Sequence, residues 1–285
     1  MYQKGAFFLI HITSHKKHKG YMSPNEILVG RSYILKHRKK QCGRCLAFLC
    51  LQFLDYIRFE SKSMKHIVIL SGAGMSAESG LKTFRDSDGL WEGHDVMEVA
   101  SPIGFEKDPA LVLEFYNQRR RQLLEVEPNR AHLALVEMEK KHKVSIITQN
   151  VDDLHERAGS KTVLHLHGEL LKVRSTADSS DVREWKEDLN IGDLCPKGSQ
   201  IRPHIVWFGE EVPAIPKAIS ICQKADILLI IGTSMQVYPA ASLMNYVRSG
   251  TKIYYIDPNP APVQNDQITV IAEAASKGIY KVKID

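Results

Sequence analysis

The chain has 285 residues, 44% hydrophobic and 25% charged, which is the composition of an ordinary globular enzyme. Its net charge of +5 is unevenly spread, since residues 1–63 hold 12 Lys and Arg against 3 Asp and Glu, leaving 26 basic against 30 acidic side chains elsewhere. The acidic body has no basic face for nucleic acid, and no apolar run approaches the roughly 20 residues of a membrane span. We expect neither kind of partner.

The first 63 residues differ from the rest of the chain. They are basic, and Met64-Lys65-His66 after them looks like a natural protein start. The apolar stretch 7–12 is too short for a secretory signal, although a mitochondrial-type presequence is an alternative. Cys42 and Cys45 have metal-ligand spacing, but a single pair is more often incidental. We expect residues 1–63 to be a poorly ordered basic extension and residues 64–285 to be the folded body.

The cysteines indicate the compartment. There are five, an odd number, and three lie in the first 63 residues. This distribution gives no disulfide framework, and free thiols fit a reducing environment. We therefore expect a cytoplasmic protein.

Short β-branched runs alternate with helical stretches after residue 63. Such runs, bounded by turn residues, are typical of parallel strands covered on both faces. They predict an α/β fold with a doubly wound, Rossmann-like parallel sheet, whose strands are residues 67–70, 144–148, 163–166, 227–231, 252–256 and 268–270.

Two segments interrupt this alternation. Residues 92–143 have helical periodicity, and residues 169–203 are rich in polar side chains. Together they should form a smaller inserted domain. The substrate cleft would then lie between the two domains, at the carboxyl ends of the strands.

The first predicted strand opens into Gly72-Ala73-Gly74-Met75-Ser76, at an expected helix start. A loop of this kind leaves backbone N–H groups free, and free N–H groups attract a pyrophosphate. A Gly-x-Gly pair alone is weak evidence, because such pairs occur in ordinary turns. The loop by itself therefore indicates a nucleotide site without establishing one.

Further segments make the pattern specific. The glycine loop continues to Thr83-Phe84-Arg85, and four motifs follow it: Gln149-Asn150-Val151-Asp152, His165-Leu166-His167-Gly168-Glu169, Val206-Trp207-Phe208-Gly209-Glu210 and Gly232-Thr233-Ser234. In this order and spacing the set resembles the sirtuin family of NAD-dependent protein-lysine deacylases, most closely the small bacterial members. The resemblance covers residues 64–285 and implies a catalytic domain that deacylates lysines with NAD, releasing nicotinamide and O-acyl-ADP-ribose.

The resemblance assigns catalytic roles to three residues. His167 would be the general base, because an imidazole can take a hydroxyl proton near neutral pH. His165 lies on the same strand face, so alternation alone does not choose between the two, whereas the family motif chooses His167. Asn150 would position the nicotinamide ribose, and Asp152 would accept from the nicotinamide carboxamide. Helix capping is the structural alternative for Asp152, although we expect Asp153 to be the cap.

The same resemblance implies the NAD-binding set. Phe84 would cover the reacting ribose, and Arg85 would reach a phosphate or the ribose. Asp257 would accept from ribose hydroxyls, which favours NAD over NADP. The full set is Gly72, Ala73, Gly74, Ser76, Glu78, Thr83, Phe84, Arg85, Trp91, Gln149, Asn150, Asp152, Gly232, Thr233, Ser234, Asp257, Asn259 and Ala275.

Two further motifs concern the acylated protein that would be the substrate. Residues 206–210 should form an edge to which the substrate peptide is added as a strand, although Trp207 and Phe208 could equally be core. Tyr116 and Arg119 match the Y-x-x-R pattern of sirtuins that remove succinyl and malonyl groups. Three residues apart on a helix, a phenol and a guanidinium can converge on one carboxylate. The alternative is that residues 119–121 are a solvated basic helix face.

One feature of most sirtuins is missing. Between the His167 motif and residue 206 the only cysteine is Cys195, where most members carry two cysteine pairs for a structural zinc. One thiolate cannot complete a tetrahedral site. We predict a smaller domain that folds without metal, its span 175–192 organised around Val182, Trp185 and Leu189. Elemental analysis should find no tightly bound zinc, and a stoichiometric amount would contradict this prediction.

Two other functions would use the same site. Mono-ADP-ribosyl transfer shares the NAD site and the first cleavage, and the sequence does not exclude it. A non-catalytic NAD or ADP-ribose sensor would keep the pocket but has little use for His167, Asn150 and Asp152 together. We expect NAD as the cofactor, acylated-lysine proteins as the partners, and a monomer.

Overall fold

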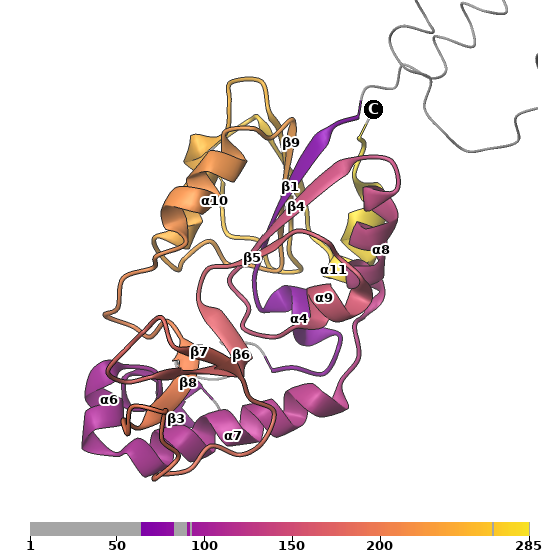
Figure 1. Cartoon of the computed structure of the whole chain (residues 1–285). Coiled ribbons are helices and arrows are strands. Elements are labelled where there is room, and N and C mark those ends of the chain that lie inside the picture. The colour runs from indigo at the N-terminus through magenta and orange to yellow at the C-terminus, as the bar shows by residue number, and fades with distance from the viewer. Residues whose placement is uncertain (1–63, 83–89, 92, 264, 285) are drawn as a thin grey trace, which may run out of the picture. The chain divides into compact units, whose positions relative to one another are not determined.

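A computed structural model of the chain describes residues 64–82, 90–91, 93–263 and 265–284 (Figure 1). The chain divides into two units after Ser63, and all described residues belong to the second. The basic extension and the predicted NAD contacts Thr83, Phe84 and Arg85 lie outside the described residues. No helix in the described part of the chain is long and apolar enough to cross a membrane.

The main sheet has six parallel strands in the order β11-β10-β9-β1-β4-β5. The chain starts at the centre, builds outward to β5, and returns to build outward on the other side, which is the doubly wound Rossmann order. The strands are β1 (His66–Ser71), β4 (Lys143–Thr148), β5 (Val163–His165), β9 (Ile227–Ile231), β10 (Lys252–Ile256) and β11 (Ile268–Ile271). Each overlaps the run predicted for it, and the predicted fold class is confirmed.

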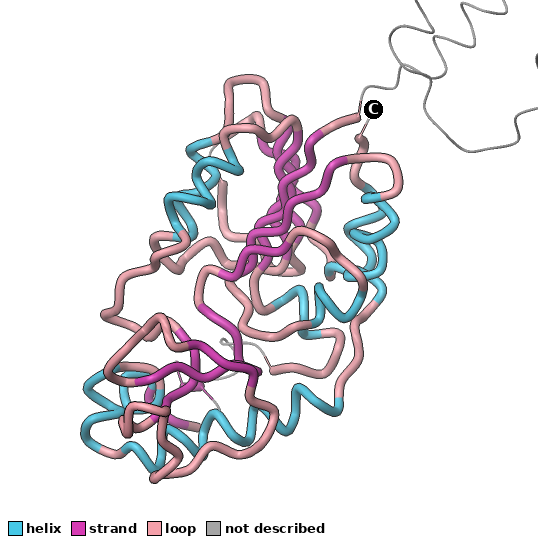
Figure 2. Tube along the Cα trace, viewed as in Figure 1, coloured by secondary structure: helices cyan, strands magenta, loops and turns pink. Residues whose placement is uncertain are grey.

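Both faces of the sheet are covered, as Figure 2 shows. Along β1, Ile67 and Ile69 belong to one buried cluster, whereas Val68 and Leu70 belong to another, because successive side chains point to opposite faces. Burial on both sides explains why the strand sequences are continuously apolar rather than alternating.

Helices form the outer layers of this arrangement (Figure 1). Those of one face are α8 (Arg130–Glu139), α11 (Ala275–Gly278) and the 3-10 helix η2 (Ile279–Lys281); those of the other are α10 (Ile215–Cys222) and the 3-10 helix η1 (Ala240–Tyr246). Helix α8 falls within the range 92–143 predicted for the smaller domain. Its buried Ala131 and Leu135 nevertheless pack on the main sheet, so it belongs to the larger layered core.

A smaller module is built on a three-stranded antiparallel sheet of order β7-β6-β8. Its longest helix, α7, contributes Val112, Phe115 and Tyr116 to a core shared with Leu170 and Trp207. The elements of the module are β2 (Leu90–Trp91), β3 (His94–Asp95), α5 (Val96–Val99), α6 (Pro102–Lys107), α7 (Pro109–Glu125), β6 (Gly168–Ser175), β7 (Val182–Glu184) and β8 (Ile201–Ile205).

The polar span 175–192 is organised partly as predicted. Leu189 is fully buried, and Asn117 of α7 holds it by two hydrogen bonds, donating to its carbonyl (3.0 Å) and accepting from its N–H (2.8 Å). Val182 lies in strand β7 and is 38% exposed. The prediction is wrong for Val182, but Leu189 and Trp185 do pack in one hydrophobic cluster.

The loops after β1 and β9 approach each other at the level of the backbone. The N–H of Gly72 donates to Ile231 O (3.0 Å), and the N–H of Gly74 donates to Gly232 O (2.8 Å). Gly232 has φ +60°, and a Cβ there would lie 2.2 Å from Met75 N. The expectation that this loop leaves its N–H groups free is wrong for Gly72 and Gly74, because the neighbouring loop accepts from both.

Replacing Gly232 with Ala should destabilise the fold more than a positive φ alone would. Gly250→Ala is the matched control, because Gly250 has φ +83° but nothing lies within 4 Å of its Cβ position. A left-handed Ala costs about 1–2 kcal/mol, and the clash at Gly232 should add about 1–3 kcal/mol. Urea unfolding measures both losses. Equal losses would show that the close approach of the two loops does not contribute to stability.

Candidate active site

The predicted catalytic residues gather at one edge of the main sheet. Asn150 and Asp152 follow β4, His167 follows β5, and Thr233 follows β9. The carboxyl ends of parallel strands share an edge, and strands β1 and β9 are where the chain order reverses. Open sheets of this kind bind ligands at that reversal.

Asn150, Ser76 and Asp152 form one hydrogen-bonded network. Asn150 Nδ2 donates to Gly72 O (3.0 Å) and to Ser76 Oγ (3.1 Å), and Ser76 Oγ donates to Asp152 Oδ2 (2.8 Å). All three side chains are buried. Ser76 is among the expected NAD contacts, and in this structure its one hydroxyl proton goes to Asp152. The network joins the glycine loop to the β4 loop.

Asp152 also begins helix α9 (Leu154–Ala158). Its Oδ1 accepts from Leu154 N at 3.1 Å, whereas Asp153 makes no side-chain capping bond and lies 3.8 Å from Arg157. Asp153 therefore occupies the N-cap position, as expected, but the capping hydrogen bond comes from Asp152. Burial raises the pKa of Asp152, although the hydrogen bonds from Ser76 and Leu154 oppose the rise.

His167 is placed as a neutral imidazole. Its Nδ1 lies 3.0 Å from Gln149 O, and because a carbonyl only accepts, Nδ1 carries the proton and Nε2 is the basic nitrogen. No described residue is hydrogen-bonded to that Nε2. Burial lowers the pKa of His167, more than the bond to the Gln149 carbonyl raises it. The ring can therefore accept a proton at neutral pH.

His165 is placed differently. Both its ring nitrogens are engaged, Nδ1 with Asn150 O and Nε2 with Glu156 Oε1, each at 2.9 Å. The structure thus separates two histidines that strand alternation left equivalent. Glu156 was missed by sequence reasoning, and nothing in its helical segment signals a contact with a strand end.

The loops after β4, β9 and β10 are tied together by further hydrogen bonds. Gln149 Nε2 donates to Thr233 Oγ1 (3.1 Å), which links the β4 and β9 loops, and Tyr255 Oη donates to Thr233 O (2.9 Å). Asp257 is buried at the end of β10, where its Oδ1 accepts from Asn259 N (2.9 Å). These contacts fix the loops that the resemblance assigns to NAD.

Glu78 links the glycine loop to helix α11 by hydrogen bonds. Its carboxylate accepts from Ser276 N (2.9 Å) and Ser276 Oγ (2.6 Å), next to the buried Ala275. A carboxylate at the first turn of a helix is stabilised by the unpaired N–H groups there. Glu78 therefore has a structural use in addition to the NAD contact expected of it.

The Y-x-x-R pair lies in the core of the smaller module. Tyr116 is 1% exposed, and its hydroxyl accepts from Trp207 Nε1 at 2.9 Å. Burial raises the pKa of Tyr116, so the phenol stays protonated. Arg119 stacks on Phe115, its guanidinium carbon 3.4 Å from the ring centroid and 5.4 Å from that of Trp91.

The three arginines of α7 have separate surroundings. Arg120 is buried and donates to Leu170 O and Asn117 Oδ1. Arg121 is 49% exposed and pairs with Glu114 and Asp188. The alternative that residues 119–121 form one solvated basic helix face is therefore wrong, because only Arg121 fits that description.

Residues 206–210 form a turn rather than a strand. Val206 N donates to His167 O (2.9 Å), which ties the segment to the general-base candidate. Trp207 is buried in the module core, whereas Phe208 is 41% exposed. Glu210 accepts from Trp207 N (2.8 Å) and pairs with Arg202 (2.7 Å), so it holds the turn in place, while Gly209 has φ +91° and completes it.

Cys195 is buried against Leu113, Val173 and Leu189. Within the described ranges, no group of three or more His, Cys, Asp or Glu side chains could hold a metal ion. Folding without zinc remains a prediction for elemental analysis to decide.

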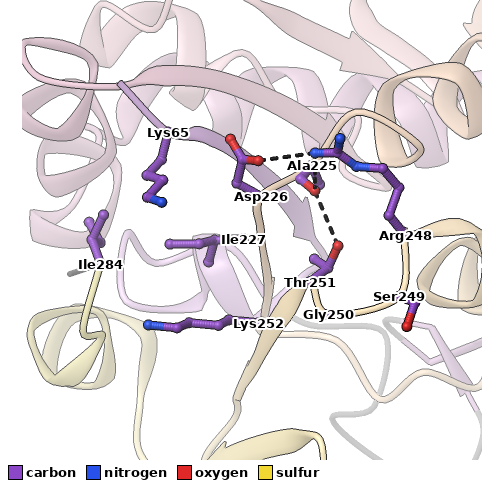
Figure 3. A pocket seen from close by; sticks show the side chains of 10 residues that line it. All are labelled: Lys65, Ala225, Asp226, Ile227, Arg248, Ser249, Gly250, Thr251, Lys252 and Ile284. Atoms are coloured by element: carbon purple, nitrogen blue, oxygen red, sulfur yellow. Dashed lines mark hydrogen bonds and ion pairs between the residues drawn. The ribbon is translucent and has the colours of Figure 1, made fainter. Parts of the chain in front are cut away.

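Figure 3 shows a cavity at the opposite, amino-terminal edge of the main sheet. Lys65, Arg248 and Lys252 line it together with Asp226, which pairs with Arg248 at 3.0 Å. None of the predicted site residues lines this cavity, so it is separate from the candidate active site.

The strand order, the packed glycine loops and the polar cluster at the strand reversal define a dinucleotide-binding protein of the Rossmann class. Within that class the chain belongs to the Sir2 family, whose family model matches residues 72–239. The sirtuin resemblance is thereby confirmed.

Relatives of known name support the assignment. The chain is 67% identical over 195 residues to an NAD-dependent protein deacylase of Helicobacter pylori, covering 68% of this chain and 85% of that protein. It is 52% identical over 227 residues to one of Bacteroides thetaiotaomicron, covering 77% and 97%.

Solved structures agree with the sequence relatives. A Sir2 homologue in complex with NAD is 41% identical, with a TM-score of 0.70, covering 77% of this chain and 88% of that one. A Sir2 protein bound to an acetylated peptide is 30% identical, with a TM-score of 0.66, covering 81% and 95%.

Proposed function

We propose that this protein is an NAD-dependent protein-lysine deacylase, which transfers acyl groups from lysine to ADP-ribose and releases nicotinamide. The observation that carries the proposal is the joint placement of His167 and the Asn150–Ser76–Asp152 network at the strand reversal. A protein that only bound the dinucleotide would have no use for a neutral imidazole with a basic nitrogen beside that network. The deacylase relatives, which align with most of the chain, support the same activity.

The residues at the sheet edge fit NAD. The glycine loops pack so closely that a Cβ at Gly72 or Gly232 would meet backbone atoms, which suits a loop that lies against a diphosphate. The buried carboxylate of Asp257 suits ribose hydroxyls and disfavours an added phosphate, so NAD is preferred over NADP. When bound, NAD supplies an activated ribose carbon with nicotinamide as its leaving group.

Each side chain of the cluster has a distinct task. His167 accepts a hydroxyl proton at Nε2, while its Nδ1–H stays on the Gln149 carbonyl and fixes the ring. Asp152 offers carboxylate oxygens for a carboxamide NH₂, and Asn150 orients the ribose. Ser76 holds both of these side chains in register.

His167→Ala should lower deacylation by about 10²–10⁴-fold, since a positioned general base contributes that much. NAD binding, measured by calorimetry, should stay close to wild type and serves as the control. Because burial lowers the pKa of His167, the acid limb of the wild-type kcat/KM profile should lie below pH 6.5, the ordinary value for histidine. An acid limb above that pH, or a loss smaller than about tenfold, would remove His167 from this role.

We further propose that the enzyme removes succinyl and malonyl groups as well as acetyl groups. Tyr116 and Arg119 lie on the same face of α7, within the aromatic cluster of Trp91, Phe115 and Trp207. Stacking on Phe115 orients the guanidinium without neutralising it, and a guanidinium binds a carboxylate bidentately.

Arg119→Met should lower desuccinylation by roughly ten- to a hundredfold, because a hydrogen bond to a charged group contributes about 1.5–3 kcal/mol. Deacetylation should barely change, because an acetyl group has no carboxylate to bind. Arg121→Met is the matched control and should affect neither reaction, since Arg121 is half exposed and paired with Glu114 and Asp188. Equal losses on succinyl- and acetyl-lysine peptides would show that Arg119 supports the fold and does not recognise the acyl group.

One incubation with NAD and an acyl-lysine peptide separates the proposed activity from its alternatives. A deacylase releases nicotinamide and O-acyl-ADP-ribose, an ADP-ribosyltransferase labels protein, and a sensor produces neither. We also propose a monomer, because every motif of the proposed site lies within this one sequence. The odd number of cysteines supports a cytoplasmic location.

A further inference from the structure

We propose that His165 is a positioning residue for the nicotinamide end of the site, which acts as an imidazolium by donating to both the Asn150 carbonyl and the Glu156 carboxylate. The catalytic consequence rests on the proposed function. The protonation state of His165 does not depend on the proposed function, and it can be measured without substrate.

The two partners of the ring require two protons. Asn150 O and Glu156 Oε1 each lie 2.9 Å from a ring nitrogen of His165, and both are acceptors. A neutral imidazole carries one N–H, so it would satisfy one partner and turn a lone pair toward the other. Only 8% of the His165 side chain is exposed, so water does not readily replace the lost bond. The doubly protonated ring satisfies both acceptors.

A proton on Glu156 is the other way to arrange the pair. The Glu156 side chain is 40% exposed, so its carboxylate is partly solvated. Burial raises the pKa of Glu156, but the hydrogen bond and charge of His165, a backbone hydrogen bond and the charge of Lys172 together lower it more. The proton therefore resides on the ring.

The surroundings of His165 are acidic. Glu156 of α9, Glu169 of β6 and Asp152 of the β4 loop carry the nearby negative charges. Lys172 of β6 is the opposing cation, and it pairs with Glu169 at 2.8 Å. Burial lowers the pKa of His165, but the hydrogen bond and charge of Glu156, the bond to the Asn150 carbonyl and the charge of Glu169 together outweigh burial, so the net shift is upward. The remaining titratable neighbour, His155 of α9, is fully buried, and burial lowers its pKa well below the ordinary value, so it adds no charge.

The hydrogen bonds that join His165 to the Asn150 carbonyl and to Glu156 form a clamp, and this clamp holds other residues of the site in place. His165 pairs with Thr148 across β5 and β4, which places its ring beside the loop that β4 enters. Asn150 is then held from both sides, its carbonyl by His165 and its Nδ2 by Gly72 O and Ser76. The imidazolium also favours the ionised form of the buried Asp152. When His165 loses its proton, Asn150 loses a charge-assisted bond and Asp152 loses a nearby cation.

These contacts determine how the activity should change with pH. The clamp is complete below the pKa of His165 and is lost as the pH rises through it. His165 should therefore set an alkaline limb in kcat/KM for NAD, above pH 6.5, while His167 sets the acid limb. Two histidines on one strand end would define both sides of the profile.

Nitrogen-15 NMR of the imidazoles of the full chain, without substrate, tests the protonation state. At pH 6.5 both nitrogens of His165 should be protonated, and the ring should titrate above that pH. Glu156→Gln should lower this pKa, and Glu169→Gln should lower it less, because Glu169 makes no hydrogen bond to the ring among those described. A singly protonated His165 at pH 6.5 would overturn the proposal.

Kinetics test the positioning role. Glu156→Gln should move the alkaline limb to lower pH without moving the acid limb. In His165→Asn the side-chain amide lies close to the position of Nδ1, so it can donate to the Asn150 carbonyl. Because an amide does not titrate, the pH profile of this variant should have no alkaline limb. His165→Leu should lose about tenfold or more in kcat/KM for NAD. Equal activity and identical pH profiles in Asn and Leu variants would show a merely structural role.

The two proposals can fail independently. If wild type turns over no NAD with any acyl-lysine peptide, the proposed function fails, whereas the NMR titration still decides the state of His165. If wild type is active but His165 titrates below pH 6.5, only the clamp fails.

Discussion

The close backbone approach of the loops after β1 and β9 is the constraint on which the rest of the site depends. Gly72 and Gly74 donate to the carbonyls of Ile231 and Gly232, and no side chain fits between them. Because β1 and β9 are adjacent central strands, this contact brings the two halves of the doubly wound sheet together at their carboxyl ends. The polar side chains of the later loops can then meet across a short gap.

From this contact the site builds outward through hydrogen bonds between loops rather than within them. Ser76 comes from the glycine loop, Asn150 and Asp152 from the β4 loop, and Thr233 from the β9 loop, where Gln149 reaches it. Buried polar groups of this kind are costly unless they are all paired. The pairing therefore fixes the positions of the loops, and the same groups are then held ready for a ligand.

The sequence alone predicted the layered core and the location of the site, because both follow from local patterns. Strands buried on both faces are continuously apolar, and parallel strands present their loops at one edge. It did not predict contacts that depend on how distant elements pack. The two hydrogen bonds between Asn117 and Leu189 and the pairing of Glu156 with His165 both join segments whose distance is set by the fold. Helix α8 was assigned to the wrong layer for the same reason, since periodicity shows an apolar face but not what covers it.

His165 and His167 show how little of a side chain's chemistry its position in a strand determines. They lie two residues apart, His165 at the end of β5 and His167 just after it, yet one ring nitrogen of His165 meets a carboxylate, whereas the hydrogen-bond partner of His167 among the described residues is a carbonyl. The Glu156 and Glu169 carboxylates and the Asn150 carbonyl together favour the charged His165 ring more strongly than burial opposes it, whereas the one carbonyl at His167 does not. The pKa values therefore move in opposite directions, and in the mechanism we propose one short motif supplies both a neutral base and a fixed cation. The difference comes from Glu156, a residue on another element, so the division of roles is a property of the packed structure.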